Sequence, residues 1–175
     1  ILNALYAQNT RYREVTSKVE GITHPYLNIG RIEGGTNTNV VPGKVMFKLD
    51  RRMIPEEHPV EVEANIREVI ARAAAEFTTP AGGITVDVKR LLLANSMKPL
   101  PGNRPLVDAI QKHGSELFGQ PIPAMGTPLY TDVRLYGEAG IPGVIYGAGP
   151  RTVLESHAKR NDERIDLEDL RRATK

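Results

Sequence analysis

The chain has 175 residues, of which 40% are hydrophobic and 25% are charged, a composition typical of a soluble globular protein. Its 23 basic and 21 acidic residues give a net charge of +2, which is too balanced to predict nucleic-acid binding. No apolar run approaches the ~18 residues of a membrane span, and the absence of cysteine excludes disulfides and thiolate metal sites. We therefore predict a cytoplasmic protein with no nucleic-acid or membrane partner.

The first half of the chain predicts a small α+β domain. In chain order, apolar spacing predicts a helix over residues 1–18, a strand over 26–33, a loop over 33–43, a strand over 44–52, an amphipathic helix over 58–77 and a strand over 84–88. One more strand before Ile1 would complete a split β-α-β-β-α-β unit of the ferredoxin-like type. The chain begins without an initiator Met or a helix-capping residue, so we expect that strand in protein preceding Ile1.

The last strand of this predicted sheet has a consequence for assembly. Residues 84–88 would form an edge of the sheet. An exposed edge strand is normally covered, charged or paired with another chain. We expect pairing with a second copy, which predicts a homodimer formed through the first half of the chain.

The second half predicts part of a larger α/β domain. Residues 95–104 break the pattern and are interpreted as a hinge. Pro105 begins a helix that ends at Gly119. The spacing assigns these residues to its apolar face: Leu106, Ala109, Ile110, His113 and Leu117. Residues 143–146 predict a strand buried on both faces, and Asp166 is the expected N-cap of a last helix.

Two helices and so few strands do not make an independent α/β domain. A lid inserted into a catalytic domain would produce this layout. We therefore predict that residues 1–92 form a lid and dimerisation domain, and that residues 93–175 are the C-terminal segment of a catalytic domain.

Of the four histidines, only His157 lies where a ligand site is expected. It follows the predicted strand 143–146, and binding sites in open α/β sheets collect beyond the carboxyl ends of strands. Imidazole is the commonest metal ligand, but a catalytic zinc needs about three protein ligands. From the residues alone, His157 is either one ligand of a larger site or a surface histidine. His24 and His58 each precede a proline and are expected to be solvent-exposed, whereas His113 is expected in the core or at its boundary.

The loop between the first two predicted strands is rich in glycine and side-chain amides. It runs from Gly34 to Gly43, longer than a tight hairpin needs, which favours a ligand-contacting loop over a simple turn. Arg52 closes the next strand, where it can bind a substrate carboxylate through two parallel hydrogen bonds. The alternative for Arg52 is a surface salt bridge with Asp50 or Glu56.

Six short motifs occur in a fixed order along the chain. They are Gly35-Thr-Asn-Thr-Asn-Val-Val-Pro42, Asp50-Arg-Arg52 with Pro55 behind it, Tyr130-Thr-Asp-Val-Arg134, Gly140-Ile-Pro142, Gly147-Ala-Gly-Pro150, and His157 with Asp162-Glu163 behind it. Each motif is weak alone. Their order and spacing resembles the zinc aminoacylase and carboxypeptidase family, whose members include acetylornithine deacetylase, succinyl-diaminopimelate desuccinylase and glutamate carboxypeptidases. The resemblance covers nearly the whole chain.

This resemblance implies a catalytic α/β domain that holds two zinc ions, with cobalt or manganese able to substitute, and an inserted lid that dimerises. By similarity, His157 matches the last zinc ligand of the family. Five more residues match positions on the substrate side: Asn39 and Arg52 grip the substrate's carboxylate end, Gly147 and Gly149 line the pocket, and Asp132 supports the site.

The same resemblance leaves most of the metal site outside this chain. The family's first zinc histidine, bridging aspartate, catalytic glutamate and remaining carboxylate ligand precede the lid and have no match here, and neither does the lid histidine. We expect a zinc-dependent amidohydrolase or peptidase that cleaves an amide bond of an N-acyl amino acid or small peptide with a free carboxylate. We expect this chain alone to be inactive. The alternative is a stand-alone dimerisation or small-molecule-binding module of ferredoxin-like fold, which would account for the first half only.

Overall fold

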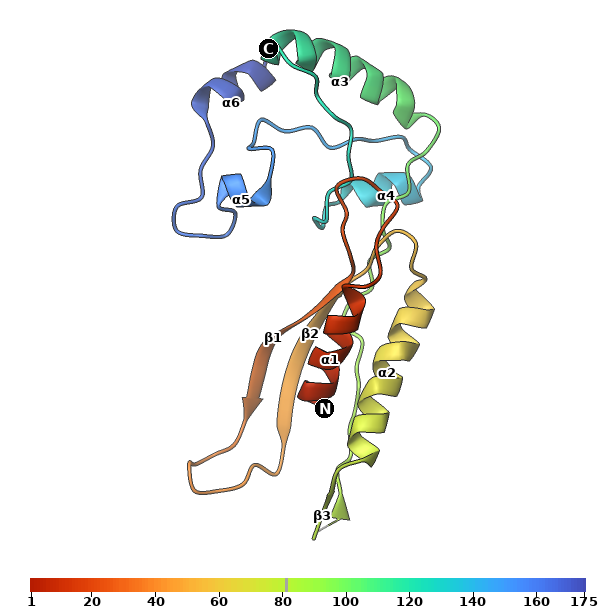
Figure 1. The fold of residues 1–175 in the computed structure, drawn as a ribbon, viewed down its shortest axis with the longest axis vertical. Coiled ribbons are helices and arrows are strands. Elements are labelled where there is room, and N and C mark those ends of the chain that lie inside the picture. The colour runs from red at the N-terminus through yellow and green to blue at the C-terminus, as the bar shows by residue number, and fades with distance from the viewer. Residues whose placement is uncertain (81) are drawn as a thin grey trace. The chain divides into compact units, whose positions relative to one another are not determined.

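The computed structural model describes residues 1–80 and 82–175, with Val153 described by its backbone only. Contacts divide the chain into two compact units, Ile1–Ser96 with Gly126–Leu129, and Met97–Met125 with Tyr130–Lys175. Figure 1 shows the elements of each unit in chain order. Helices occur together with small antiparallel sheets, which confirms the predicted mixed α/β class. The assignment of the two halves to a lid and a catalytic domain stays a prediction.

The core of the first unit lies between a β-hairpin and two helices (Figure 1). β1 (Tyr26–Gly34) and β2 (Val45–Arg52) pair antiparallel, which confirms both predicted strands. Alternate side chains of the hairpin face the helices because successive residues of a strand point to opposite faces. The core cluster contains Leu5, Tyr12, Leu27, Ile66, Val69 and Ile70, with Ile29, Phe47 and Leu49 packed against it.

Of the two helices of this unit, one agrees with the predicted helix and the other is shorter than predicted. α2 (Pro59–Ala75) confirms the amphipathic helix, and proline stands at its first position, where no backbone hydrogen bond is lost. α1 (Leu2–Tyr12) is shorter than the predicted helix over residues 1–18. Beyond the buried Tyr12, residues 13–16 are exposed, so no apolar contact supports another turn of helix. The backbone there continues in turns.

Residues 84–88 form no strand in the described part of the chain, so the predicted strand is wrong. Alternation determines which side chains are buried, but a strand also needs a neighbour for its backbone hydrogen bonds. Val88 does pack against the core, whereas Ile84 and Val86 are 41% and 40% exposed. The nearest ladder joins the two-residue strands β3 (Thr78–Thr79) and β4 (Gly82–Gly83).

Side chains rather than a ladder hold this extended segment to α2. Arg67 Nη1 donates to the carbonyl of Val88 over 3.0 Å. Glu63 accepts from Arg90 Nη1 over 2.8 Å and pairs with Arg67 on its other oxygen. The hydrogen bond from Arg67 and the positive charge of Arg90 lower the pKa of Glu63 from its ordinary value.

In the second unit, α3 (Asn103–Phe118) confirms the helix expected from Pro105. It ends at Gly119, whose φ of 69° is left-handed and suits glycine. Most of the predicted apolar face is exposed, and Ile110 is the one residue of that face that is half-buried. Asn103 and Gly114 are the buried residues, while Leu106 is 41% exposed. His113, expected at the core boundary, has a side chain 68% exposed, because the helix packs on the face that carries Gly114.

A buried asparagine determines how α3 begins. Asn103 Nδ2 donates to the carbonyl of Gly143 over 2.7 Å, and Asn103 Oδ1 accepts from the backbone of Leu100 over 3.3 Å. A buried amide is costly unless it is hydrogen-bonded, so these contacts select the face of the helix that packs inward. The spacing of apolar residues along the helix does not reveal this face, because a polar side chain determines it.

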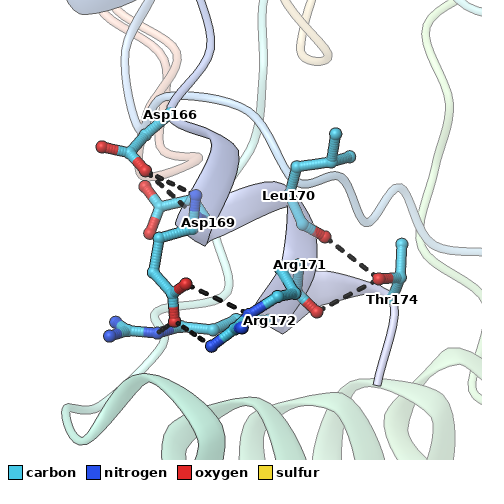
Figure 2. A network of polar contacts seen from close by, with 7 residues as sticks. Asp166, Asp169, Leu170, Arg171, Arg172 and Thr174 are labelled. Atoms are coloured by element: carbon cyan, nitrogen blue, oxygen red, sulfur yellow. Dashed lines mark hydrogen bonds and ion pairs between the residues drawn. The ribbon is translucent and has the colours of Figure 1, made fainter.

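The remaining helices of the second unit are short. α4 (Val133–Glu138) and α5 (Val153–Ser156) were not predicted, because one or two turns carry no usable periodicity. α6 (Leu167–Ala173) was predicted, with Asp166 as its N-cap. The Asp166 side chain accepts from the backbone of Glu168 over 2.7 Å and of Asp169 over 3.4 Å, as Figure 2 shows for Asp169.

Residues 143–146 form no strand in the described part of the chain, so the prediction of a doubly buried strand is wrong. Ile145 is 57% exposed and Tyr146 is 42% exposed. A strand buried on both faces requires strands beside it and helices on both sides. The described part of the second unit contains no strand that could pair with it.

None of the helices among the described residues combines the length and the apolar character needed to cross a lipid bilayer.

Candidate functional site

Arg52 ends β2 on the face of the hairpin that points away from the helices. Successive residues alternate, so Asp50 and Arg52 share one face while Leu49 and Arg51 share the other. Arg52 Nε donates to Asp50 Oδ2 over 2.7 Å, and the Arg52 side chain is 37% exposed. The surface ion pair expected as the alternative for Arg52 is therefore present. The exposed guanidinium nevertheless remains within reach of a ligand.

Arg51 lies on the core face and is a buried charge, with its side chain only 6% exposed. Its guanidinium carbon lies 4.0 Å from the centre of the Tyr12 ring. Nη2 donates to Glu57 Oε1 over 2.5 Å, and Nη1 donates to the carbonyl of Arg52. A buried charge is stable only when it is paired. Its partners come from α1, from the turn before α2 and from β2 itself.

The neighbours of Arg51 are themselves fixed by hydrogen bonds. Glu57 Oε2 accepts from the backbone of Ile54 over 3.0 Å, and the Tyr12 hydroxyl donates to Asn65 Oδ1 over 3.2 Å. A hollow of about 530 Å³ opens beside them. Both acidic and basic side chains line the hollow, among them Arg11, Glu14, His58 and Glu61. This mixture favours neither an anionic nor a cationic ligand.

Glu56, the other expected partner of Arg52, is engaged elsewhere. Its carboxylate accepts from the backbone of Lys18 over 2.7 Å and from the Ser17 hydroxyl over 3.1 Å. The hydrogen bond from Lys18 holds the pKa of Glu56 below its ordinary value. Glu56 therefore joins two turns of the first unit. Of the two carboxylates expected to pair with Arg52, only Asp50 does so.

Asn39 lies in an exposed turn of the loop between β1 and β2. A side chain on Gly34 would come within 2.8 Å of the carbonyl of Lys44, and Gly35 has a φ of 86°, so the backbone requires both glycines. A hollow of about 410 Å³ lies in the loop. Its lining includes Val40, Val41 and Pro42.

The structure does not bring Asn39 and Arg52 together within one hairpin. Pairing runs from Gly34↔Val45 beside the loop to Tyr26↔Arg52 at the other end. The steps from Val45 to Arg52, at ~3.4 Å per residue, separate these ends by roughly 24 Å. One ligand carboxylate cannot touch both side chains of the same hairpin. Each residue is therefore a separate candidate for substrate contact.

His157 has a left-handed backbone, with a φ of 52°. This conformation is uncommon for residues other than glycine and is concentrated at functional sites. Its Nδ1 lies 2.5 Å from Asp162 Oδ2, and its Nε2 lies 3.2 Å from Arg164 Nη2. A carboxylate accepts and a guanidinium only donates, so a neutral ring here carries its proton on Nδ1. The lone pair of Nε2 then accepts from Arg164 Nη2, so Nε2 binds a metal ion only where that contact is broken.

Gly147 and Gly149 lie in an irregular loop of the second unit. Among the described residues, an added Cβ on Gly149 would meet nothing within 4 Å, and one on Gly147 would meet only the backbone nitrogen of Gly149 at 4.0 Å. Neither glycine is needed for packing within the unit. Their predicted place along a pocket stays a prediction.

Asp132, the expected supporting residue, stands at the N-cap position of α4 with an exposed side chain. The arginine of the same motif is held more firmly. Arg134 Nη2 donates to the Tyr130 hydroxyl over 3.0 Å and Nη1 reaches Glu138 over 3.4 Å. The contact with Tyr130 raises the pKa of Arg134. The motif is therefore connected internally, and the role of Asp132 stays a prediction.

The described residues do not make up a zinc site on their own. No three His, Asp or Glu side chains among them gather as ligands of one ion. The contact of His157 Nδ1 with Asp162 is one that metal-binding histidines commonly make, whereas Arg164 Nη2 occupies the Nε2 side where an ion would bind. A zinc ion needs about three protein ligands, so this donor set does not fit a complete site.

The sequence patterns used above did not predict the buried cluster of Arg51, Tyr12 and Glu57. The alternation of β2 nevertheless indicates this cluster, because Phe47, Leu49 and Arg51 lie on one face of the strand. A charged residue continuing an apolar face predicts a buried ion pair.

A known protein family matches part of the first unit. Residues 1–78 match the family model M20_dimer, described as the peptidase dimerisation domain. The matched region takes in α1, the β1–β2 hairpin and α2. No curated protein matches the chain. At this coarse level the match supports a relation to M20 peptidases and the formation of a homodimer. Residues 1–78 are thus similar to the dimerisation domain of the M20 peptidases.

Proposed function

We propose that this chain is part of a metal-dependent amidohydrolase or peptidase of the aminoacylase and carboxypeptidase type. The observation that carries the proposal is the match of residues 1–78 to the peptidase dimerisation domain. In this proposal residues 1–92 form the lid and dimerisation domain, and residues 93–175 complete the catalytic domain. The enzyme is a cytoplasmic homodimer that associates through its lids.

The proposed substrate is an N-acyl amino acid or small peptide with a free carboxylate. The exposed guanidinium of Arg52 supports this class, because arginine binds carboxylates through paired hydrogen bonds. Asn39 serves as a second substrate contact, from another part of the lid. Binding the carboxylate away from the scissile bond helps to position the amide for attack.

The second unit supplies part of the metal site and the pocket in this proposal. His157 is one ligand of a two-zinc centre and is oriented by Asp162. Gly147 and Gly149 line the pocket and Asp132 supports it. The remaining ligands come from outside this chain, so the chain alone is inactive.

The test compares the complete enzyme with the 175-residue chain. N-acyl amino acids are offered as free acids and as the matching primary amides, and zinc is measured on the same samples. We expect the complete enzyme to hydrolyse the acids, and Arg52→Ala to lower kcat/KM for the acids about tenfold or more. Arg31→Ala, at an exposed arginine of β1, is the control and should change little.

Three outcomes would count against this function. Unchanged kcat/KM in Arg52→Ala would remove the role of Arg52. Stoichiometric zinc in the 175-residue chain would contradict an incomplete metal site. A complete protein that dimerises but hydrolyses no amide would support the stand-alone dimerisation module instead.

A further inference from the structure

We infer that Arg51 is a positioning residue that fixes Arg52 for carboxylate binding. This inference rests on the proposed function, in which Arg52 binds the substrate's carboxylate. It assigns a separate task to the neighbouring arginine, whose side chain is buried.

The alternation of β2 gives these adjacent arginines opposite surroundings. Arg51 follows Phe47 and Leu49 onto the core face, and its side chain is 6% exposed. Arg52 points to the other face, and its side chain is 37% exposed. One arginine is therefore a buried structural cation, and the other is accessible to a ligand.

Contacts on several sides hold the Arg51 guanidinium still. The Tyr12 ring covers one face at 4.0 Å, and Glu57 accepts from Nη2 over 2.5 Å. Nη1 donates to the carbonyl oxygen of Arg52, the last residue of β2. The donors of a planar guanidinium have a fixed geometry, so the contacts with Tyr12 and Glu57 also fix the direction in which Nη1 donates to Arg52.

The carbonyl of Arg52 is where such a constraint is needed. The β1–β2 ladder ends at the pair Tyr26↔Arg52, so no later ladder pair holds the backbone there. Strand ends fray when their backbone groups are exposed to water. The hydrogen bond from Arg51 fixes the peptide plane that follows Arg52 and so restricts the direction of its side chain.

Asp50 completes the arrangement on the outer face. Its Oδ2 accepts from Arg52 Nε over 2.7 Å, which orients the guanidinium along the strand. The two terminal nitrogens of Arg52 then present parallel N–H groups, the geometry that a carboxylate accepts as a bidentate ligand. Arg51 therefore fixes the backbone that carries the Arg52 side chain, and Asp50 fixes the side chain at Nε.

The first experiment measures side-chain order in the 175-residue chain. Arg Nε–H relaxation by NMR should give Arg52 a high order parameter that falls in Arg51→Gln. Arg31→Gln, which removes an exposed arginine paired with Glu33 on the same hairpin, is the matched control and should leave Arg52 unchanged. An Arg52 order parameter that is the same in Arg51→Gln and in wild type would overturn the inference.

The second experiment measures selectivity in the complete enzyme, as the ratio of kcat/KM for an acid substrate to that for its primary amide. We expect Arg51→Gln to lower this ratio about tenfold, since a misplacement of about 1 Å at a binding group costs up to 10²-fold. In the Arg52→Ala background, Arg51→Gln should lower the ratio no further. A purely structural role would lower both rates together and leave the ratio intact.

The two variants distinguish a failure of the role of Arg51 from a failure of the role of Arg52. A ratio lost in Arg52→Ala but kept in Arg51→Gln overturns the inference and leaves the proposed function standing. A ratio unchanged in Arg52→Ala overturns the inference together with the proposed role of Arg52. If Arg51→Gln does not fold, Glu57→Gln is used, because it removes the negative charge that pairs with Arg51 and keeps the cation. It should lower the ratio in the same direction, and an unchanged ratio would overturn the inference.

Discussion

The guanidinium carbon of Arg51 lies 4.0 Å from the centre of the Tyr12 ring, and the hydroxyl of that ring donates to Asn65 Oδ1 over 3.2 Å. One aromatic side chain of α1 therefore contacts both β2 and α2. Tyr12 is 7% exposed, so these contacts are shielded from water. This ring links the two helices and the strand that carries Arg52.

Replacing Tyr12 should therefore destabilise the first unit. Tyr12→Leu keeps an apolar side chain but removes the cation–π contact and the hydrogen bond, so we expect the free energy of unfolding to fall by about 1–3 kcal/mol. Urea denaturation of the chain measures this. Tyr6→Leu, on the same helix at a position 51% exposed, is the control and should change it by less than about 0.5 kcal/mol. Equal effects of the two variants would contradict the role of Tyr12.

Glu56 should make the stability of the first unit sensitive to acid. The backbone hydrogen bond from Lys18 lowers the folded-state pKa of Glu56 below its ordinary value of 4.5. A carboxylate with a lowered pKa stabilises the fold fully above the unfolded-state pKa, and this contribution is lost as the pH falls through the folded-state pKa. We expect Glu56→Gln to flatten the decrease in stability below about pH 4.5.

The measurement is urea denaturation of wild type and variant at a series of pH values from 3 to 7. Glu68→Gln, at an exposed position of α2, is the matched control. If Glu56→Gln and Glu68→Gln give the same pH dependence, the contact with Lys18 contributes nothing to acid stability.

Asp162 should determine the tautomer of His157. In wild type we expect the Nδ1–H form, because Asp162 Oδ2 lies 2.5 Å from Nδ1 and Arg164 lies on the Nε2 side. Nitrogen chemical shifts of the imidazole at neutral pH report the tautomer directly. Asp162→Ala should lower the population of the Nδ1–H form, because only the contact of Nε2 with Arg164 then favours it. Asp108→Ala, which removes an exposed carboxylate from α3, should not, and a wild type in the Nε2–H form would contradict the assignment.

The cap of α6 should contribute measurable stability. Asp166 accepts hydrogen bonds from two backbone N–H groups of the first turn, as drawn in part in Figure 2. Asp166→Ala removes the oxygen that accepts both hydrogen bonds and should cost about 1 kcal/mol, with a loss of helical circular dichroism. Asp166→Asn keeps an acceptor oxygen and should cost much less. Equal losses in the two variants would mean that charge, and not the hydrogen bond, stabilises this helix end.

The sequence predicted those elements whose pattern is local. The hairpin and α2 were predicted because alternation and helical spacing are strong over eight residues or more, as in β2 and its flanking elements. The cap at Asp166 was predicted because its chemistry is contained within four residues. Such features need no knowledge of what lies across the fold.

Elements that depend on a distant partner were predicted less well. The segments 84–88 and 143–146 have the composition of strands, yet each lacks a neighbouring strand among the described residues. The inward face of α3 depends on Asn103, whose amide donates to Gly143 far along the chain. The buried state of Arg51 depends on Tyr12 and Glu57 in the same way.

The most informative single measurement is the molar mass of the 175-residue chain in solution, by sedimentation equilibrium over a range of concentrations. The similarity of residues 1–78 to a peptidase dimerisation domain predicts a concentration-dependent approach to twice the monomer mass of 19.3 kDa. A mass that stays at 19.3 kDa up to the highest concentrations would contradict dimerisation through this half of the chain.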